Sequence, residues 1–405
     1  MKNNRLYGYI LYPLIVLMLL IQPVDSYGSS NLEKRPLDKG LNAALAYLLN
    51  FVGPEAVDSG SFSTDKISAL LEFVVKPKDD AVLYYASEIN GASSAYHEID
   101  IKGEIDQILR LTYNPEIPSV ITMPSTLRLS HWKKMDTPDN TLPKFWEHLP
   151  NLDSPLFVTG IEHIVNSPDY SSGAYFEYDL YRTLIVMKHQ GRSVLISLSQ
   201  QKDVSDVGKK GIVIGPDENW DYIYTDVPGV NKSGFGWVKS YMYDSYSVSF
   251  YSEMEADRPT VRFSGFKWVN AGFAGINLAR SIHIHSGMVR FSSGFKEILE
   301  NPRIADTPTI ATAWKTVKNL PDQDLRQITQ DHLAKLEEKC TTNGLMSDKQ
   351  VASMFVDQQY LNTLNREEMQ VFVILEHLKQ ILNDSNPPTL SYLPAYLKLP
   401  NNLKK

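Results

Sequence analysis

Cysteine is almost absent from this chain. The 405 residues contain a single one, Cys340. A chain with one thiol cannot form an internal disulfide, which argues against a disulfide-dense extracellular module. Stability must therefore come from a hydrophobic core, which a chain of this length with 43% apolar residues can build. Cys340 falls in a helical pattern, and we interpret it as a structural thiol rather than a nucleophile.

Long basic runs and, beyond the first 30 residues, long apolar runs are also missing. The formal net charge is −7. Phosphate binding needs clustered lysine and arginine, so we expect no nucleic-acid partner. No later segment approaches 18 continuous apolar residues. We therefore expect a membrane contact only through the N-terminal segment, if that segment is not cleaved.

That N-terminal segment has the order of a secretory signal peptide. Lys2 and Arg5 carry positive charge, an apolar stretch covers residues 6–21, and small residues follow up to Ser30. We predict a signal peptide over residues 1–28 and an exported protein, located in the periplasm or cell envelope if the source is bacterial. The alternative is an uncleaved anchor, although a spanning helix needs about 20 apolar residues. A lipoprotein is excluded, because no cysteine lies near the cleavage site.

Motifs of common enzymes are missing too. The sequence contains no Gly-x-Ser-x-Gly, His-Glu-x-x-His, Walker or dinucleotide-binding pattern. Ser-x-x-Lys matches such as Ser264–Lys267 and Ser293–Lys296 lack the partner motifs of penicillin-binding enzymes. His283 and His285 fall in a helical pattern, where residues two apart point about 200° apart and cannot share a metal. We predict no metal and no cofactor, and the catalytic residues, if any, stay unknown.

Four carboxylates are candidates for glycosidic cleavage, because paired acids can cleave glycosidic bonds. Glu177 and Asp179 alternate along one predicted strand and so share a face, while Asp221 and Asp244 belong to later strands. The alternative is that such residues form the solvent-facing side of an antiparallel sheet. Tyr178 and its apolar neighbours would then form the opposite, packed side.

Hydrophobic periodicity predicts strands in the middle of the chain and helices on both sides. Helices are expected over residues 38–51, 64–74, 99–113, 282–300, 307–319, 323–340, 347–359 and 365–382. Strands are expected over residues 81–89, 157–165, 174–180, 183–189, 194–198, 222–227, 235–251 and 260–269. Consecutive strands with short links are typical of an antiparallel sheet.

The predicted fold class is therefore α+β. An antiparallel, aromatic-rich sheet is packed by a long amphipathic helix at about residues 282–300, and an all-helical extension follows. The predicted divisions are the signal peptide (1–28), the sheet domain (29–300, with a helical start over 38–75 and strands over about 156–269) and the extension (301–405). A curved sheet closed by one long helix is how helix-grip lipid carriers enclose a pocket, although architecture alone does not establish function.

Aromatic residues crowd the strand region, with 15 of them within residues 170–251. Tyr222 and Tyr224 share one predicted strand face, Tyr241 and Tyr243 share another, and Trp237 lies in a glycine-rich turn. Such a face offers an apolar wall with hydroxyl groups that can orient a ligand. The plainer explanation is that aromatic residues simply favour sheets.

The last candidate is Arg182, which falls between two predicted strands. It could pair with Asp179 or meet an anionic head group, or it could be a solvent-exposed turn residue. The predicted ligand-binding residues are Tyr222, Tyr224, Trp237, Tyr241, Tyr243 and Arg182. The predicted function is non-catalytic binding of an apolar or amphipathic, lipid-like small molecule. The alternatives are a carbohydrate-binding or glycoside-cleaving protein and an interaction scaffold that uses the C-terminal helices.

Overall fold

A computed structural model describes residues 32–170, 172–232, 236–254, 258–304, 307–342, 355 and 359–382. The predicted signal peptide lies outside these residues, and so does most of the predicted helix over residues 347–359. Within the described part of the chain, no helix is both long and apolar enough to cross a membrane.

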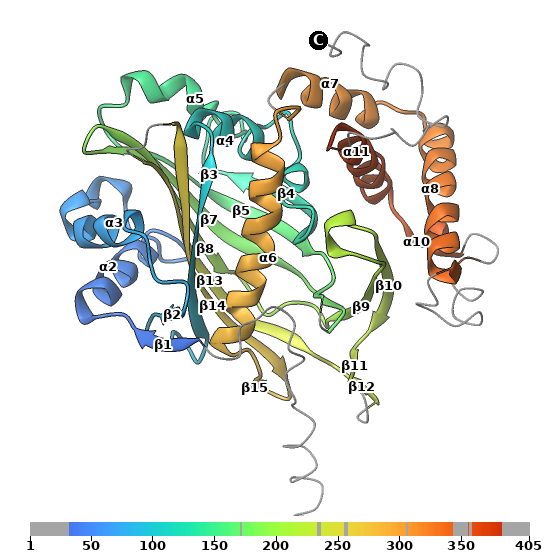
Figure 1. Ribbon diagram of the computed structural model, residues 1–405, viewed down its shortest axis with the longest axis horizontal. Helices are drawn as coiled ribbons and strands as arrows, with labels where there is room; N and C mark the ends of the chain where they lie inside the picture. The colour runs from blue at the N-terminus through green and yellow to red at the C-terminus, as the bar shows by residue number, and fades with distance from the viewer. Residues whose placement is uncertain are drawn as a thin grey trace, which may run out of the picture.

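An antiparallel sheet of eight strands forms the centre of the molecule (Figure 1). Its order is β15-β14-β13-β8-β7-β5-β4, with β3 also paired to β14. The strands are β3 (Ser93–Lys102), β4 (Leu127–Met135), β5 (Leu156–Asn166), β7 (Glu177–His189), β8 (Arg192–Gln201), β13 (Tyr241–Glu253), β14 (Thr260–Phe273) and β15 (Ile276–Asn277). Strands adjacent in the chain mostly pair with one another, as the short predicted links imply.

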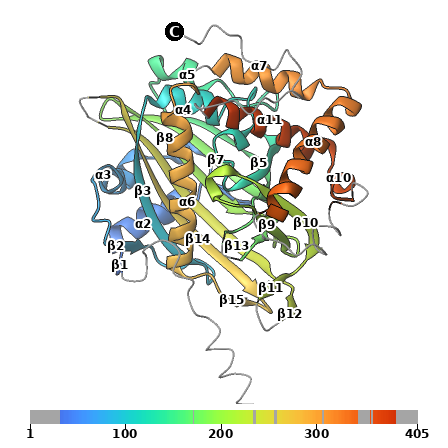
Figure 2. The same cartoon turned by 45° about the vertical axis from the view of Figure 1, so that its right-hand side comes forward.

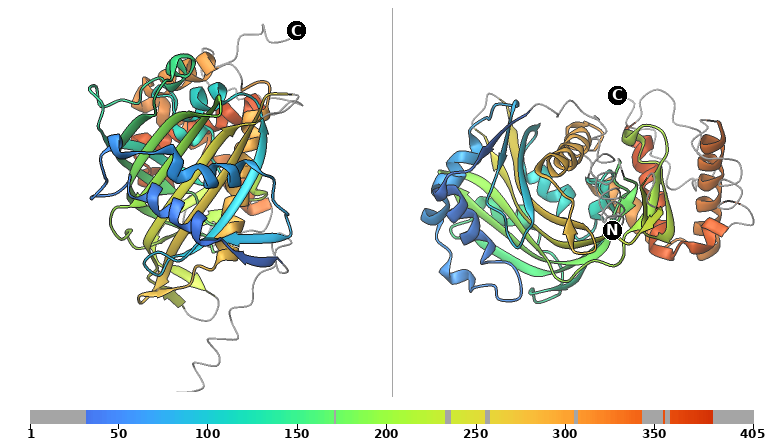
Figure 3. Two further views of the ribbon diagram at one scale, coloured as in Figure 1. Left: turned by 90° about the vertical axis from the view of Figure 1, so that its left-hand side faces the viewer. Right: turned by 90° about the horizontal axis from the view of Figure 1, so that it is seen from below.

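Two short helices, α2 (Lys39–Leu49) and α3 (Ser68–Val75), cover the outer face of this sheet (Figure 3). Asp38 begins α2, because its side chain accepts a hydrogen bond of 2.8 Å from the Leu41 amide. The outer face is tightly packed, and Phe250, Phe266 and Trp268 are all buried in it. Beside these helices, β1 (Glu33–Pro36) pairs in parallel with β2 (Val82–Tyr85).

The long helix α6 (Ser281–Glu300) lies on the inner face, and the sheet curves around it (Figure 3). Phe295 and Ile298 are buried in the contact, and Phe291 packs edge-on against Phe263 at 5.3 Å between ring centroids. The shorter α4 (Ile105–Thr112) also contacts this side through β13. The apolar stripe predicted for the long helix thus faces the sheet.

A small sheet and the C-terminal helices lie beyond α6 (Figures 1 and 2). The small sheet has the order β10-β9-β6, and β11 pairs separately with β12. These elements are β6 (Ala174–Tyr175), β9 (Lys209–Val213), β10 (Tyr222–Pro228), β11 (Val230–Lys232), β12 (Gly236–Val238), α7 (Thr307–Lys318), α8 (Asp322–Thr342), α10 (Gln359–Thr363) and α11 (Arg366–Leu382). The remaining short turns are α5 (Phe145–His148), η1 (Ser59–Ser61), η2 (Thr64–Ile67), η3 (Ser119–Ile121), η4 (Leu149–Asn151) and η5 (Asp217–Asn219).

One hydrophobic core runs through both the sheet and the C-terminal helices, from Ile101 to Ile381. The Tyr360 hydroxyl accepts a hydrogen bond of 2.9 Å from the Tyr224 amide, which links α10 to β10. The predicted domain boundary at residue 300 stays a prediction. The predicted α+β class, with its antiparallel sheet, long packed helix and helical C-terminal part, is confirmed.

Strand pairing corrects two of the predicted elements. The first part of the predicted helix over 99–113 is the end of β3, because β3 pairs with β14 as far as Lys102, and Gly103 breaks the strand at φ 142. The predicted interruption between residues 180 and 183 does not exist, since β7 runs from Glu177 to His189 and pairs with β8 over ten residues, from Leu180 to His189.

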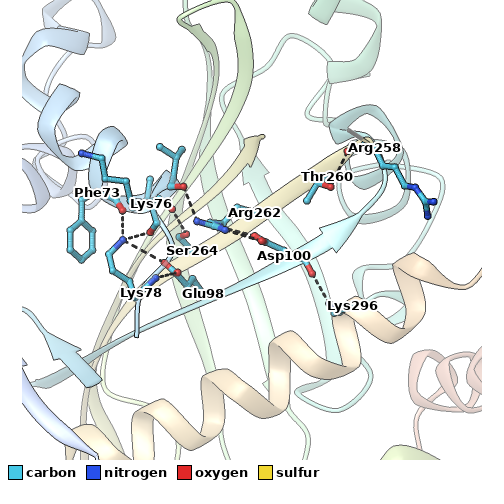
Figure 4. A network of polar contacts seen from close by, with 12 residues as sticks. Phe73, Lys76, Lys78, Glu98, Asp100, Arg258, Thr260, Arg262, Ser264 and Lys296 are labelled. Atoms are coloured by element: carbon cyan, nitrogen blue, oxygen red, sulfur yellow. Dashed lines mark hydrogen bonds and ion pairs between the residues drawn. The ribbon is translucent and has the colours of Figure 1, made fainter. Parts of the chain in front are cut away.

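Hydrogen bonds and ion pairs of charged side chains connect α3 to the edge of the sheet (Figure 4). Arg262 on β14 forms a bidentate ion pair with Asp100 on β3, at 2.6 and 2.8 Å, and also donates to the Val75 carbonyl at 2.7 Å. The Lys78 ammonium donates to the Phe73 carbonyl at 2.5 Å. Basic groups that bind the last carbonyls of a helix satisfy its orphan acceptors and its dipole. This network therefore holds the C-terminal end of α3.

Candidate ligand-binding face

A row of polar residues crosses the middle of the inner face. Directly paired residues place Lys267 of β14 beside Ser247 of β13, Ser199 of β8 and Arg182 of β7. Opposite residues in antiparallel strands project to the same side, so these four side chains form one continuous row. We call Lys267, Ser247, Ser199 and Arg182 the polar row. Its side is the α6 side, because Gly265, two residues before Lys267, lies against the Met288 side chain of α6.

Three of the four members of the polar row are partly accessible, whereas Ser199 is buried. Lys267, Ser247 and Arg182 are half-buried, as is Ser249 two positions further along β13. On the outer face of the same strands, Phe250 and its neighbours are fully buried. Polar side chains in the centre of a sheet are therefore accessible on the side that α6 covers.

Arg182 ends the polar row and is paired. Its Nε donates to the carboxylate of Glu162 on β5, and Nη1 donates to the Ser197 hydroxyl at 3.0 Å. The second oxygen of Glu162 accepts a hydrogen bond from Ser130 on β4. Burial alone would lower the pKa of Arg182, but Glu162 and nearby tyrosines outweigh burial and raise it. Arg182 is thus an interior arginine and not a turn residue, and its partner is Glu162 rather than Asp179.

Lys267, at the other end, differs from Arg182. Among the described residues, none forms a hydrogen bond or an ion pair with its ammonium group. Burial, with a smaller contribution from the Arg182 charge, lowers the pKa of Lys267 from 10.5 to about 8. At neutral pH the side chain is therefore mostly an ammonium ion without a fixed counter-charge.

Aromatic rings pack on the inner face four residues along β13 and β14 from Ser247 and Lys267. Tyr251 on β13 lies 5.3 Å from Phe263 and 5.8 Å from Phe295 between ring centroids. Tyr113, which ends α4, lies 6.4 Å from Tyr251. Burial raises the pKa of Tyr113 and Tyr251, so both hydroxyls are neutral. The inner face thus combines an aromatic region with a charged one.

The predicted tyrosines occupy two other places. Tyr222 and Tyr224 on β10 are buried in the core, and Tyr222 donates to Asp217 at 2.7 Å while accepting from Arg290 of α6 at 3.0 Å. The Arg128 guanidinium lies 3.8 Å from the Tyr224 ring centre. These contacts join the small sheet to α6 and β4.

Tyr241 and Tyr243 lie near the beginning of β13, with ring centroids 6.0 Å apart, and the Gly275 amide donates to the Tyr243 hydroxyl at 2.8 Å. Trp237 belongs to β12, but its side chain lies outside the described residues. The structure therefore does not bring the predicted residues into one cluster, and their ligand-binding role stays a prediction. Only Arg182 among them lies in the polar row.

Sequence reasoning missed Glu162, Lys267 and the serines of the polar row. A signal for Lys267 existed, because it occupies an inward position of the strand that also places Val261, Phe263 and Val269 inward. A charge on the packed side of a strand requires a partner or a ligand. The serines carry no comparable signal, since serine is common on both sides of strands.

The predicted carboxylates Glu177 and Asp179 do share a face, opposite the packed side of Tyr178. Asp179 accepts from Lys133 and pairs with His163, each at 2.8 Å. Burial would raise the pKa of Asp179, but these two partners hold it below its usual value. A general acid for glycosidic cleavage needs a raised pKa, so this environment does not favour that role.

A polar cavity of about 350 Å³ lies next to these carboxylates, between the β4–β5 edge, the small sheet and the start of α11. Its charged groups are largely paired with one another, as Arg128 is with Glu368 at 2.8 Å and His163 with Glu177 at 3.4 Å. The lining is Arg128, Leu129, His131, His163, Val165, Glu177, Lys209, Asp226, Asn365, Glu367 and Glu368. This balance of charge favours a structural contact between α11 and the sheet.

Three possible metal ligands meet where α8 and α11 approach β10. Ligand atoms of Asp221, His332 and Glu376 all lie within 4.8 Å of one another. The Lys379 ammonium donates to Asp221 at 2.7 Å and to Glu376 at 2.6 Å, and Lys339 donates to Asp221 as well. Two ammonium groups already supply the positive charge that a cation would bring, so we interpret this cluster as an ionic contact between helices.

His283 and His285 lie on α6, as the helical prediction required. His285 packs against His97 of β3, with ring centroids 5.2 Å apart, and a hydrogen bond of 2.8 Å joins His97 to the Ser292 hydroxyl. Burial, and the nearby His285, lower the pKa of His97 from 6.5 to about 4. Burial also lowers the pKa of His285, so the rings of His97 and His285 are mostly neutral at pH 7 and help to join α6 to β3.

Comparison with known proteins gives little guidance. No family model matches the chain, and no curated protein matches it. Among solved structures, the chain is similar to the human StarD13 (DLC2) lipid transfer and protein localization domain, with 11% identity over 61% of this chain and 98% of that one. The TM-score is 0.24, and a similarity of this size does not bear on function.

Proposed function

We propose that this protein binds an amphipathic, lipid-like small molecule between the inner face of its sheet and α6, without chemical conversion. The N-terminal sequence supports a further part of the proposal, which is that the protein acts after export. The observation that carries the proposal is the polar row on the α6 side of the sheet, three of whose four members are half-buried, with the rings of Tyr251 and Phe263 four residues further along the same strands.

Energetics support this location. A charged or hydroxyl group in the middle of a sheet costs free energy unless a partner compensates it. The outer face of the same strands carries tightly packed apolar side chains and shows that this sheet can be packed conventionally. Polar and aromatic groups that converge on one incompletely packed face are typical of small-molecule sites. A molecule with an apolar body and a polar end would complement both regions.

Native mass spectrometry tests the proposal. The protein is measured after purification, and again after incubation with a total lipid extract. We expect an added mass that corresponds to one bound amphipathic molecule. A bare protein mass in both measurements would overturn the proposal.

Two matched variants locate the bound molecule. Ser249→Phe places a ring on the half-buried inner face, and Ser293→Phe places the same ring on the exposed side of α6. We expect Ser249→Phe to reduce the bound fraction and Ser293→Phe to leave it unchanged. Equal occupancy in both variants would place the ligand elsewhere.

A further inference from the structure

The charges of the inner face are unequally compensated. Arg182 is neutralised by Glu162, and on α6 Arg290 is neutralised by Asp217, whose oxygens accept at 2.6 Å from both Nε and Nη2. Lys267, in contrast, has no such partner among the residues that the structure describes. Among these three described basic residues, Lys267 is therefore the one whose charge is not neutralised.

Hydroxyl groups lie directly beside this charge. Ser247 is the cross-strand neighbour of Lys267, and its Oγ lies 2.6 Å from the Oγ of Ser199. One of the two hydroxyls donates its hydrogen to the other. The hydroxyl that accepts still has its own hydrogen, which it can donate to a further acceptor. Lys267 and this serine pair can together bind the oxygen atoms of one anionic group.

An apolar region begins four residues away on the same strand. Phe263 precedes Lys267 at this spacing on the same face, and its ring contacts Tyr251 of β13 and Phe291 of α6 at 5.3 Å each. An acyl chain that leaves the polar row in this direction would run beneath α6 along aromatic rings. The order of charge, hydroxyls and rings corresponds to the order of head group and chain in an anionic amphipath.

We propose that the ligand is an anionic amphipath, a carboxylate or phosphate ester on an acyl chain, and that Lys267 with Ser247 and Ser199 binds its head group. This inference rests on the proposed function and specifies its ligand class. The anion supplies the counter-charge that the folded chain does not provide for Lys267. Other titratable groups of the inner face and its covering helices are His97, Tyr113, Tyr178, Glu162, Arg182, Tyr251, His285 and Arg290. In addition, α6 carries His283, Lys296, Glu297 and Glu300, and α4 carries Asp106 and Arg110.

Displacement of the neutral dye Nile red by oleate and by oleyl alcohol tests the inference, because these two molecules share a chain and differ in the charge of the head group. At pH 7 we expect oleate to bind about 10-fold more tightly, or more, as one charged hydrogen-bonded contact allows. Inorganic phosphate at millimolar concentration should not displace the dye. Equal affinities for oleate and the alcohol would overturn the inference while the proposed function stands.

Substitutions give a second, independent readout. Lys267→Met should weaken oleate binding about 10-fold and change oleyl alcohol binding by less than about 2-fold, while Lys267→Arg retains oleate binding. Lys296→Met is the matched control, since Lys296 lies on α6 and pairs with Glu300 at 3.6 Å. Unchanged oleate binding by a folded Lys267→Met variant would overturn the inference. Failure of both ligands to bind the folded wild-type protein would overturn the proposed function, and the inference with it.

Discussion

Removal of the Glu162 charge gives the sharpest prediction about the inner face. Glu162 lies on β5 and its side chain is 7% exposed, and that of its partner Arg182 is 18% exposed. Its two oxygens accept hydrogen bonds from Arg182 and Ser130. Glu162→Gln preserves the size of the side chain and removes its charge. The guanidinium of Arg182 then still donates to the Ser197 hydroxyl, at 3.0 Å, and can donate to the neutral amide oxygen of the glutamine.

The expected cost follows from what remains buried. Removal of one partner from a buried ion pair costs about 3–5 kcal/mol, because the other charge loses its compensation. Since the amide oxygen of glutamine can still accept one hydrogen bond, we expect a loss near the lower end, about 3 kcal/mol of unfolding free energy. The double variant Glu162→Leu with Arg182→Met removes both charges. Its unfolding free energy should lie within about 1 kcal/mol of the wild-type value, or exceed it.

Urea unfolding at pH 7, followed by circular dichroism, measures these free energies. The control is Asp106→Asn, which breaks an ion pair of 2.6 Å whose side chains are 43% and 38% exposed. We expect that change to cost about 1 kcal/mol or less, as for other exposed pairs. If Glu162→Gln costs no more than Asp106→Asn, the inner face is screened by water as a surface is, and the argument for an interior site is refuted.

Three further predictions concern protonation and capping. Because burial lowers the pKa of His97 to about 4, the folded protein binds fewer protons than the unfolded chain between pH 4 and 6.5. The contribution of neutral His97 to the unfolding free energy is full above pH 6.5 and is lost as the pH falls toward 4. In urea unfolding, His97→Gln should therefore reduce the change of unfolding free energy with pH in this range. An unchanged pH dependence would contradict the assignment of this effect to His97. Oleate binding should weaken as the pH rises through about 8, where Lys267 loses its charge, and Lys267→Arg should extend binding to higher pH; a flat profile in wild type would count against Lys267. Asn365→Ala should destabilise α11 by about 1 kcal/mol, since Asn365 and Glu368 form reciprocal capping hydrogen bonds of 3.0 and 2.7 Å, and an unchanged melting temperature would contradict this.

The elements that the sequence predicted well are those with strong local signals. The amphipathic pattern over residues 282–300 predicted α6, and the helical periodicity over residues 365–382 predicted α11. Strand β3 was mistaken for a helix over residues 99–102, because Ile101 is spaced four residues from Ile105 of α4 and its pairing with Val261 of β14 is a long-range contact. Period and length alone cannot distinguish such short apolar runs.

The candidate site was harder to predict than the fold. Tyrosine crowding pointed to the strand region, but Tyr222 and Tyr224 are buried in contacts of the small sheet with α6 and β4. The polar row combines residues from β7, β8, β13 and β14, which are adjacent through sheet registers. A register is set by the pairing of whole strands, so no local pattern places Lys267 beside Ser247 or Arg182 beside Ser199.

Photo-crosslinking with a diazirine-labelled fatty acid tests the central claim most directly. After irradiation, the labelled peptides are identified by mass spectrometry, with unlabelled oleate as competitor. If a lipid-like molecule binds between the inner face and α6, label should appear in the peptides of β13, β14 and α6 and should decrease with competitor. Label confined to the outer-face helices α2 and α3, or to the C-terminal helices α7 to α11, would contradict the claim.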